Sequence, residues 1–85
     1  MGKYSILFRR SVLKDLEVLP KKDVQRILEA IRTLAVDPRP PQSQKLSGRE
    51  QYRLRQGTYR ILYVIQDDVL IVTVVKVGHR REVYR

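Results

Sequence analysis

The fold is decided by residues 51–66, which read QYRLRQGTYRILYVIQ. Apolar and polar side chains alternate at the start of this stretch, so Tyr52 and Leu54 point to one face and the arginines that follow each of them point to the other. Residues 57–58, Gly-Thr, suit a tight hairpin turn, and an apolar strand follows over 59–66. The stretch predicts a β-hairpin with one buried face and one face that carries arginines.

The chain on either side adds two further strands to this hairpin. Residues 69–77 are apolar on both faces, which is typical of a buried central strand, and 67–68, Asp-Asp, predict the turn before it. Near the amino terminus, the alternation over residues 4–9 predicts a first strand with Tyr4, Ile6 and Phe8 on one side. The sequence therefore indicates one early strand and a three-stranded meander.

Two helices are predicted between the first strand and the hairpin. Residues 11–19 carry apolar side chains at helical spacing, with Ser11 as the expected N-cap and Pro20 ending the helix. An apolar stripe at the same spacing predicts a second helix over 21–34. Because each helix has an apolar stripe, both must pack on an apolar surface. Three prolines within residues 37–43 then predict a stiff surface connection, and 45–48 continue that loop.

Together these elements predict a single domain over residues 1–85 of the α+β class. The expected architecture is an antiparallel four-stranded sheet in the order β-α-α-β-β-β, with a helical hairpin packed on one face. The opposite face, which carries Arg53 and Arg55, is left open. We therefore expect the functional site on that face.

The composition narrows the kind of partner. The chain has 85 residues with 18 Lys and Arg against 9 Asp and Glu, a net charge of +9. Such an excess attracts polyanions, of which nucleic acid is the most common in the cytosol, although a solvated basic surface kept for solubility is the alternative. Cysteine is absent and histidine occurs once, which excludes disulfides, thiolate nucleophiles and a zinc site. The sequence shows neither a signal peptide nor a membrane span, so we expect a cytoplasmic location.

Several basic and aromatic residues are expected to meet on the open face. Arg53 and Arg55 share one face of a strand, and Arg60 follows the hairpin turn close to them. A bend at Gly78 would bring His79, Arg80 and Tyr84 over the sheet. For each residue alone a plainer role is open: a solvated arginine, a structural histidine, or a tyrosine that covers the sheet edge.

The residue types limit the chemistry that this face can perform. We find no acidic pair placed to hold magnesium, no phosphate-binding glycine loop and no serine triad. No cofactor is therefore expected. One reaction suits arginine, tyrosine and histidine without a metal: cleavage of RNA by its own 2′-hydroxyl. The protein must then align the nucleophile, stabilise the phosphorane and manage two protons.

At these residues the chain resembles the RelE branch of the RelE/ParE toxin superfamily. The resemblance covers nearly the whole chain. The motifs that carry it are Lys45-Leu46-Ser47-Gly48, Tyr52-Arg53-Leu54-Arg55, Gly57-Thr58-Tyr59-Arg60-Ile61-Leu62-Tyr63 and Val77-Gly78-His79-Arg80-Arg81-Glu82-Val83-Tyr84. It implies the toxin of a type II toxin–antitoxin system: an endoribonuclease, or mRNA interferase, that cleaves mRNA in the ribosomal A site and inhibits translation. It also implies a cognate RelB-like antitoxin with an acidic helical segment.

The resemblance assigns roles to the candidate catalytic residues. Arg53 and Arg55 match the family's basic strand pair, which is often lysine; as arginines they stay protonated and are assigned to charge stabilisation and positioning. Arg60 matches its phosphate-binding arginine, Arg80 the arginine linked to leaving-group protonation, and Tyr84 its substrate-orienting tyrosine. Tyr84 and His79 remain the candidates for proton transfer. We further expect three residues to bind RNA outside this cluster, namely Lys45, Arg49 and Arg81.

Two other functions stay open at this point. The ParE branch shares the fold but acts on DNA gyrase, and it generally lacks the basic residues and tyrosine found here. A non-catalytic module that docks on RNA or on an acidic peptide would also carry a basic face.

Overall fold

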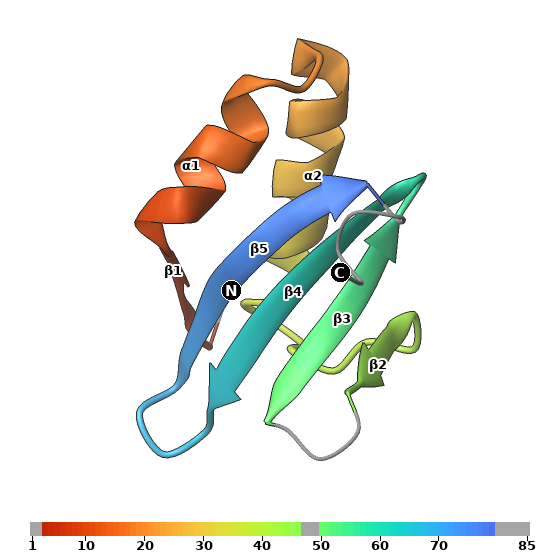
Figure 1. Ribbon diagram of the computed structural model, residues 1–85. Coiled ribbons are helices and arrows are strands. Elements are labelled where there is room, and N and C mark those ends of the chain that lie inside the picture. Colours follow the sequence, from red (N-terminus) through yellow and green to blue (C-terminus); the bar gives the residue numbers. More distant parts are fainter. Residues whose placement is uncertain (1–2, 47–49, 80–85) are drawn as a thin grey trace.

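The computed structural model describes residues 3–46 and 50–79 (Figure 1). Within these ranges it has the elements β1 (Ser5–Phe8), α1 (Arg10–Glu17), α2 (Lys21–Thr33), β2 (Ser43–Lys45), β3 (Gln51–Gln56), β4 (Tyr59–Gln66) and β5 (Ile71–His79). The strands form one sheet in the order β1-β5-β4-β3-β2. In Figure 1, α2 passes behind β5, so the face of the sheet toward the viewer is the one that α2 does not cover.

The α+β class and the helices on one face are confirmed, whereas the four-stranded antiparallel sheet is wrong in two respects. The sheet has five strands among the described residues, because β2 pairs antiparallel with β3. Moreover, β1 pairs with β5 in parallel. No tight turn joins these two strands, so no local sequence signal fixes their relative direction.

The helices form where the apolar stripes predict them, with different ends. Arg9 is the N-cap of α1 and makes no side-chain cap bond, so the expectation that Ser11 caps this helix is wrong. Helix α1 already ends at Glu17, and Pro20 instead serves as the N-cap of α2. The stripes pack on the sheet and contribute the buried residues Val12, Ile27, Ile31 and Leu34.

The turns explain where the last strand begins. Gly57 adopts a φ of +59°, which suits the tight turn between β3 and β4. The next turn extends beyond Asp67 and Asp68 to Leu70, whose φ is +55°. Strand β5 therefore starts at Ile71 rather than at residue 69, and it lies between β1 and β4 as its apolar character predicts.

The proline-rich connection is fixed to the core by tyrosines. Tyr63 is fully buried, its ring stacks on that of Tyr52 with centroids 5.8 Å apart, and its hydroxyl donates to the carbonyl of Pro38 over 2.7 Å. Pro38 and Pro40 are themselves buried. The connection is thus part of the packed structure and not only a surface loop.

An ion pair between Arg39 and Asp67 is the centre of a hydrogen-bonded group of four residues that are far apart in the sequence. The guanidinium of Arg39 donates to both carboxylate oxygens of Asp67, over 2.8 Å and 3.2 Å, and its Nε donates to the hydroxyl of Tyr52 over 3.0 Å. The hydroxyl of Tyr4 donates to Asp67 over 2.6 Å. These hydrogen bonds, with that from Arg39 the strongest, lower the pKa of Asp67 from its ordinary value of 3.8 to about 2.

This pKa predicts how the fold responds to acid. Because the pKa of Asp67 is lower in the folded state, its carboxylate stabilises the protein above about pH 4, and this contribution is lost as the pH falls from about 4 to about 2. We expect urea unfolding to show a loss of stability in this window that is smaller in Asp67→Asn. Asp68→Asn, in the same turn, is the matched control. Equal acid sensitivity of wild type and Asp67→Asn would contradict the assignment.

Candidate functional site

The face of the sheet opposite the helices, here called the open face, brings basic side chains from three strands together. Residues directly opposite one another in β3, β4 and β5 form two adjacent rows, Arg55–Arg60–Gly78 and Arg53–Leu62–Lys76. Directly opposed side chains lie about 5 Å apart at their Cβ atoms. We call the four basic residues of these rows, Arg53, Arg55, Arg60 and Lys76, the cationic cluster.

The members of the cationic cluster differ in burial. Arg60 is only 3% exposed, so packing holds its guanidinium in place. Arg55 and Lys76 are exposed, whereas Arg53 is half-buried and donates from Nη2 to Oε1 of Gln44 on β2. A cavity of about 170 Å³ lies at this edge of the sheet, lined by Gln42, Gln44, Arg53 and Arg55. The cluster thus has one fixed cation and accessible ones beside it.

The electrostatics of the open face favour a polyanion. Like charges that lie directly opposite each other destabilise a sheet, yet Arg55 faces Arg60 in this register. No acidic residue shares this face within the described parts of β3, β4 and β5. Such a cluster is stabilised when negative charge, such as a phosphate group, is bound between the cations.

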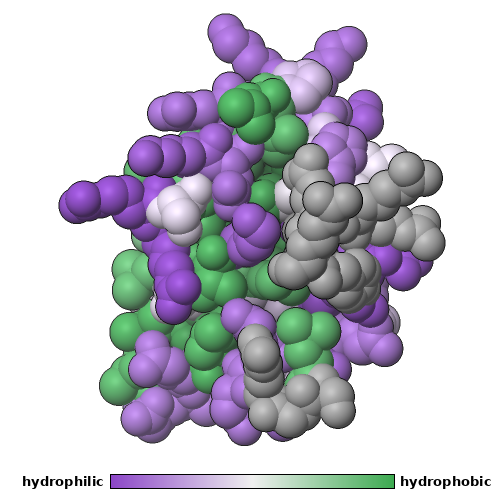
Figure 2. Space-filling view, in the orientation of Figure 1, coloured by the Kyte–Doolittle hydropathy of each residue, from purple (hydrophilic) through white to green (hydrophobic). Residues whose placement is uncertain are grey.

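Apolar surface lies next to the cationic cluster. Leu62 and Val64 of β4 are half-buried on the open face, and Leu7 of β1, opposite Thr73, is 50% exposed. Figure 2 views this side of the molecule and shows hydrophobic surface bordered by hydrophilic side chains. The open face therefore offers both charge and apolar contact to a partner.

The prediction that His79 lies with these arginines is wrong. His79 pairs with Tyr59, so its side chain is on the helix side of the sheet, where the two ring centroids are 4.7 Å apart. Gly78 does not bend the chain, since β5 remains paired with β4 through His79. Instead, Gly78 lies directly opposite Arg60.

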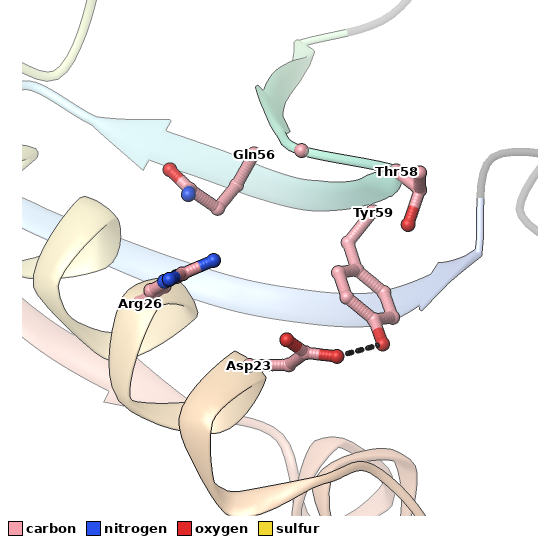
Figure 3. A pocket seen from close by; sticks show the side chains of 6 residues that line it. Asp23, Arg26, Gln56, Thr58 and Tyr59 are labelled. Carbon is pink, nitrogen blue, oxygen red and sulfur yellow. Dashed lines mark hydrogen bonds between the residues drawn. The ribbon is translucent and has the colours of Figure 1, made fainter.

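A second polar cavity lies on the helix side of the sheet (Figure 3). It measures about 240 Å³ and is lined by Asp23, Arg26, Gln56, Gly57, Thr58 and Tyr59. Asp23 and Arg26 reach from α2 toward the turn between β3 and β4. The hydroxyl of Tyr59 donates to Asp23 over 2.6 Å, and this hydrogen bond raises the pKa of Tyr59. The sequence did not indicate this pairing.

Lys45, the one remaining predicted site residue within the described ranges, does not join the cationic cluster. Lys45 belongs to β2 rather than to a loop, and it lies opposite Tyr52, on the other side of the sheet from Arg53. Its Nζ is 3.7 Å from a carboxylate oxygen of Glu50. The other four, Arg49, Arg80, Arg81 and Tyr84, lie outside the described residues.

Sequence reasoning missed two residues of the open face. Lys76 is the one charged residue in an apolar strand, and strand alternation from Gly78 would have placed it on this face. Gln44 lies on β2, a strand of three polar residues that carries no recognisable strand signal. Lys76 could therefore have been found from the alternation of side chains along the strand, whereas Gln44 could not.

Two further observations bear on the kind of site. Residues 3–46 and 50–79 contain no cluster of three or more potential metal ligands. The helices in the same ranges are too short and too polar to cross a membrane.

Comparisons with known proteins agree with the fold. A family model described as the ParE toxin of the type II toxin–antitoxin system parDE matches residues 6–84. A protein of Methanocaldococcus jannaschii described as the toxin RelE1 is 32% identical over 98% of this chain and 97% of its own length. Toxin RelG of Mycobacterium tuberculosis is 33% identical over 96% of this chain and 97% of its own length.

A solved structure shows the same arrangement of elements. The archaeal RelE–RelB complex from Pyrococcus horikoshii contains a chain that matches with a TM-score of 0.84 at 29% identity, covering 94% of this chain and 98% of that chain. The chain described here therefore belongs to the RelE/ParE superfamily of type II toxins, in its RelE branch. The resemblance inferred from its motifs is confirmed.

Proposed function

We propose that this toxin is an endoribonuclease that cleaves mRNA in the ribosomal A site, with the cationic cluster as part of its active surface. The observation that carries the proposal is the pair Arg55 and Arg60, directly opposite each other on a face where the described strand residues are free of acidic side chains. Bidentate guanidinium contacts suit the non-bridging oxygens of a phosphodiester. We further propose that the toxin acts in the cytoplasm, where its substrate is found.

The proposed reaction uses the RNA as its own nucleophile. The 2′-oxygen of a nucleotide attacks the adjacent phosphorus, and the bond from phosphorus to the 5′-oxygen breaks. The products are a 2′,3′-cyclic phosphate and a 5′-hydroxyl. A base removes the proton of the 2′-hydroxyl, an acid protonates the leaving oxygen, and cations stabilise the charge on the phosphorane. This reaction needs no metal ligand from the protein.

The burial of the arginines suggests separate roles. Arg55 is exposed and can contact the phosphate first, together with Arg53. Arg60 is 3% exposed, so the atoms that cover it must move aside before a phosphate can reach its guanidinium. A cation held in place in this way is suited to the transition state, where charge builds up during bond formation. We propose Arg80 and Tyr84 as further catalytic groups, and Lys45, Arg49 and Arg81 as contacts to RNA.

The position of His79 predicts the outcome of a pH–rate experiment. Its ring packs on Tyr59, on the side of the sheet away from the arginines, so we do not expect it to accept the proton. His79→Phe keeps an aromatic ring on Tyr59 and removes the titratable group. We expect its cleavage rate to stay within about 3-fold of wild type, with the same pH profile between pH 5.5 and 7.5. A pH profile that changes in His79→Phe would reinstate His79 as the base and leave Tyr84 without that role.

The ribosome is expected to assist the reaction. Within the described part of the open face, the strands supply no Asp, Glu or His that could act as a general base. Alignment of the 2′-hydroxyl must then come from the bound ribosome to a large extent. We expect a free oligonucleotide to be cut much more slowly than the same sequence on a programmed ribosome. Equal rates at equal RNA concentration would remove the ribosome from the mechanism.

A cognate antitoxin is the second proposed partner. Solved relatives include RelE–RelB complexes from Pyrococcus horikoshii and Methanococcus jannaschii. The net charge of +9 and the adjoining cationic and apolar surfaces support an acidic amphipathic helix as the antitoxin segment that binds here. The test is a structure of the toxin–antitoxin complex. If the antitoxin leaves the open face free, it can neutralise the toxin only by keeping it off the ribosome.

One experiment separates this proposal from its alternatives. The matching family model is that of ParE, the branch that the sequence resemblance associates with DNA gyrase. Expression of the toxin should be induced briefly, with mRNA ends mapped by primer extension and DNA breaks measured in the same cells. New mRNA ends within translated codons are expected. Gyrase-linked DNA breaks with intact mRNA would favour the ParE activity. If neither new mRNA ends nor DNA breaks appear, the non-catalytic binding module is favoured.

A further inference from the structure

Among the described residues, the end of β5 nearest to residue 80 has no partner strand on one side. The parallel pairing with β1 ends at Phe8, which lies opposite Val74. From Lys76 to His79, β5 is paired with β4 alone among the described residues, and the chain after β1 continues into α1. Backbone groups of β5 that face α1 must therefore find their hydrogen-bond partners outside the sheet.

A carboxylate of α1 takes the place of the missing strand. The backbone N–H of Val77 donates to Oδ2 of Asp15 over 3.1 Å, a contact between residues 62 apart in the sequence. Val77 is 2% exposed, so without Asp15 its N–H would be buried with no acceptor in this position. Because the Asp15 carboxylate is a charged acceptor, this hydrogen bond is strong and fixes the position of Val77 in β5 relative to α1.

A carboxylate of α2 secures the same end from another direction. His79 packs on the ring of Tyr59, and the hydroxyl of Tyr59 donates to Asp23 over 2.6 Å. Asp23 lies in the first turn of α2, where the helix dipole favours a negative charge. The last residues of β5 are thus held by one acidic residue from each helix.

Gly78 lies between these two attachment points. It is directly opposite Arg60, so any shift of β5 at Val77 or His79 changes the surroundings of the buried arginine of the cationic cluster. The surroundings of Arg60 therefore depend on where β5 ends.

We propose that Asp15 and Asp23 are positioning residues, which hold the end of β5 so that Arg60 is correctly placed for cleavage. The kinetic part of this inference rests on the proposed nuclease function, whereas the anchoring itself does not. Neither carboxylate lies on the open face, and neither contacts the substrate in this scheme. They act through the backbone of Val77 and through Tyr59 and His79.

The first test measures anchoring without any activity. Asp15→Ala removes the acceptor, Asp15→Asn keeps a side-chain oxygen in its place, and Glu17→Ala alters an exposed acidic residue of the same helix. By NMR, we expect the Val77 amide to exchange at least about 10-fold faster in Asp15→Ala, and within about 3-fold of wild type in the other two. Unchanged exchange in Asp15→Ala would overturn the anchor, whatever the protein cleaves.

The second test measures kcat and KM on programmed ribosomes, at a temperature where every variant is folded. We expect Asp15→Ala to lower kcat by about 10- to 100-fold, with KM within about 2-fold and with recovery in Asp15→Asn. Tyr59→Phe keeps the ring against His79 but cannot donate to Asp23, so it should lower kcat in the same way. Ile27→Val, a core change that touches neither anchor, controls for lost stability.

The two tests separate the failure of this inference from the failure of the proposed function. If wild type cleaves and Asp15→Ala has the kcat of Ile27→Val, the positioning role is wrong and the nuclease function stands. If wild type does not cleave, the nuclease function and the kinetic part both fail, while the exchange of Val77 still decides whether Asp15 anchors β5.

Discussion

Arg60→Ala is expected to lower the single-turnover rate of mRNA cleavage on programmed ribosomes by about 10²–10³-fold. The guanidinium of Arg60 is held in place on the open face, directly opposite Arg55, and its positive charge is needed most when the phosphorane forms. An interaction that is made mainly in the transition state affects kcat rather than binding. Affinity for the ribosome should therefore stay within about 3-fold of wild type.

Two further variants distinguish catalysis from folding. Arg60→Lys keeps a positive charge and should recover part of the rate, although it cannot make bidentate contacts. Arg32→Ala removes an exposed arginine from α2, on the helix side of the sheet, and should leave the rate unchanged. If Arg60→Ala is folded by circular dichroism and cleaves at the wild-type rate, Arg60 has only a structural role.

Replacing one nucleotide of the mRNA by its 2′-deoxy form is expected to abolish cleavage next to it. The substitution is placed at the nucleotide on the 5′ side of the scissile phosphate. Because the proposed nucleophile is the 2′-oxygen, its removal takes away an intramolecular reaction whose advantage can exceed about 10⁵-fold. No cut should be detectable at this position by primer extension, even after long incubation with excess toxin.

The control is an mRNA of the same sequence that carries the 2′-deoxynucleotide at a different position. A 2′-deoxynucleotide one position further downstream removes a hydroxyl that has no part in the attack, so cleavage at the original phosphate should persist within about 10-fold. Cleavage that survives at the substituted position would mean that water, and not the RNA, supplies the nucleophile. The arginines would then not stabilise a phosphorane formed by attack of the 2′-oxygen.

The hairpin of β3 and β4 could be predicted from the sequence because two local signals agree. Alternation placed Tyr52 and Leu54 in the core and Arg53 on the open face, and Gly57 marked the turn between the strands. Both signals act over a few residues, so no distant contact is needed to interpret them. The cationic cluster was largely visible for the same reason.

His79 was misplaced because Gly78 was expected to bend the chain. Strand β5 instead stays paired with β4 through Gly78 and His79. Side chains alternate between the two faces of a strand, so His79 follows Gly78 onto the helix side, opposite Tyr59. The pairing that keeps this strand straight comes from β4, and no local pattern around Gly78 reports it.

Long-range polar contacts could not be predicted at all. Arg39 and Asp67 are 28 residues apart, and Asp15 and Val77 are 62 apart. In the sequence each of these acidic residues resembles an ordinary helix or turn residue. Their partners are determined by the packing of complete elements, which no local pattern reports.

The chemistry of the cut mRNA ends tests the proposed cleavage mechanism most directly. Purified toxin is added to ribosomes programmed with a defined mRNA, and both new ends at the A-site codon are analysed. We predict a 2′,3′-cyclic phosphate and a 5′-hydroxyl, formed by wild type and lost in Arg55→Ala/Arg60→Ala without loss of ribosome binding. A 3′-hydroxyl with a 5′-phosphate, or intact mRNA on toxin-bound ribosomes, would contradict the claim that the cationic cluster promotes attack by the 2′-hydroxyl.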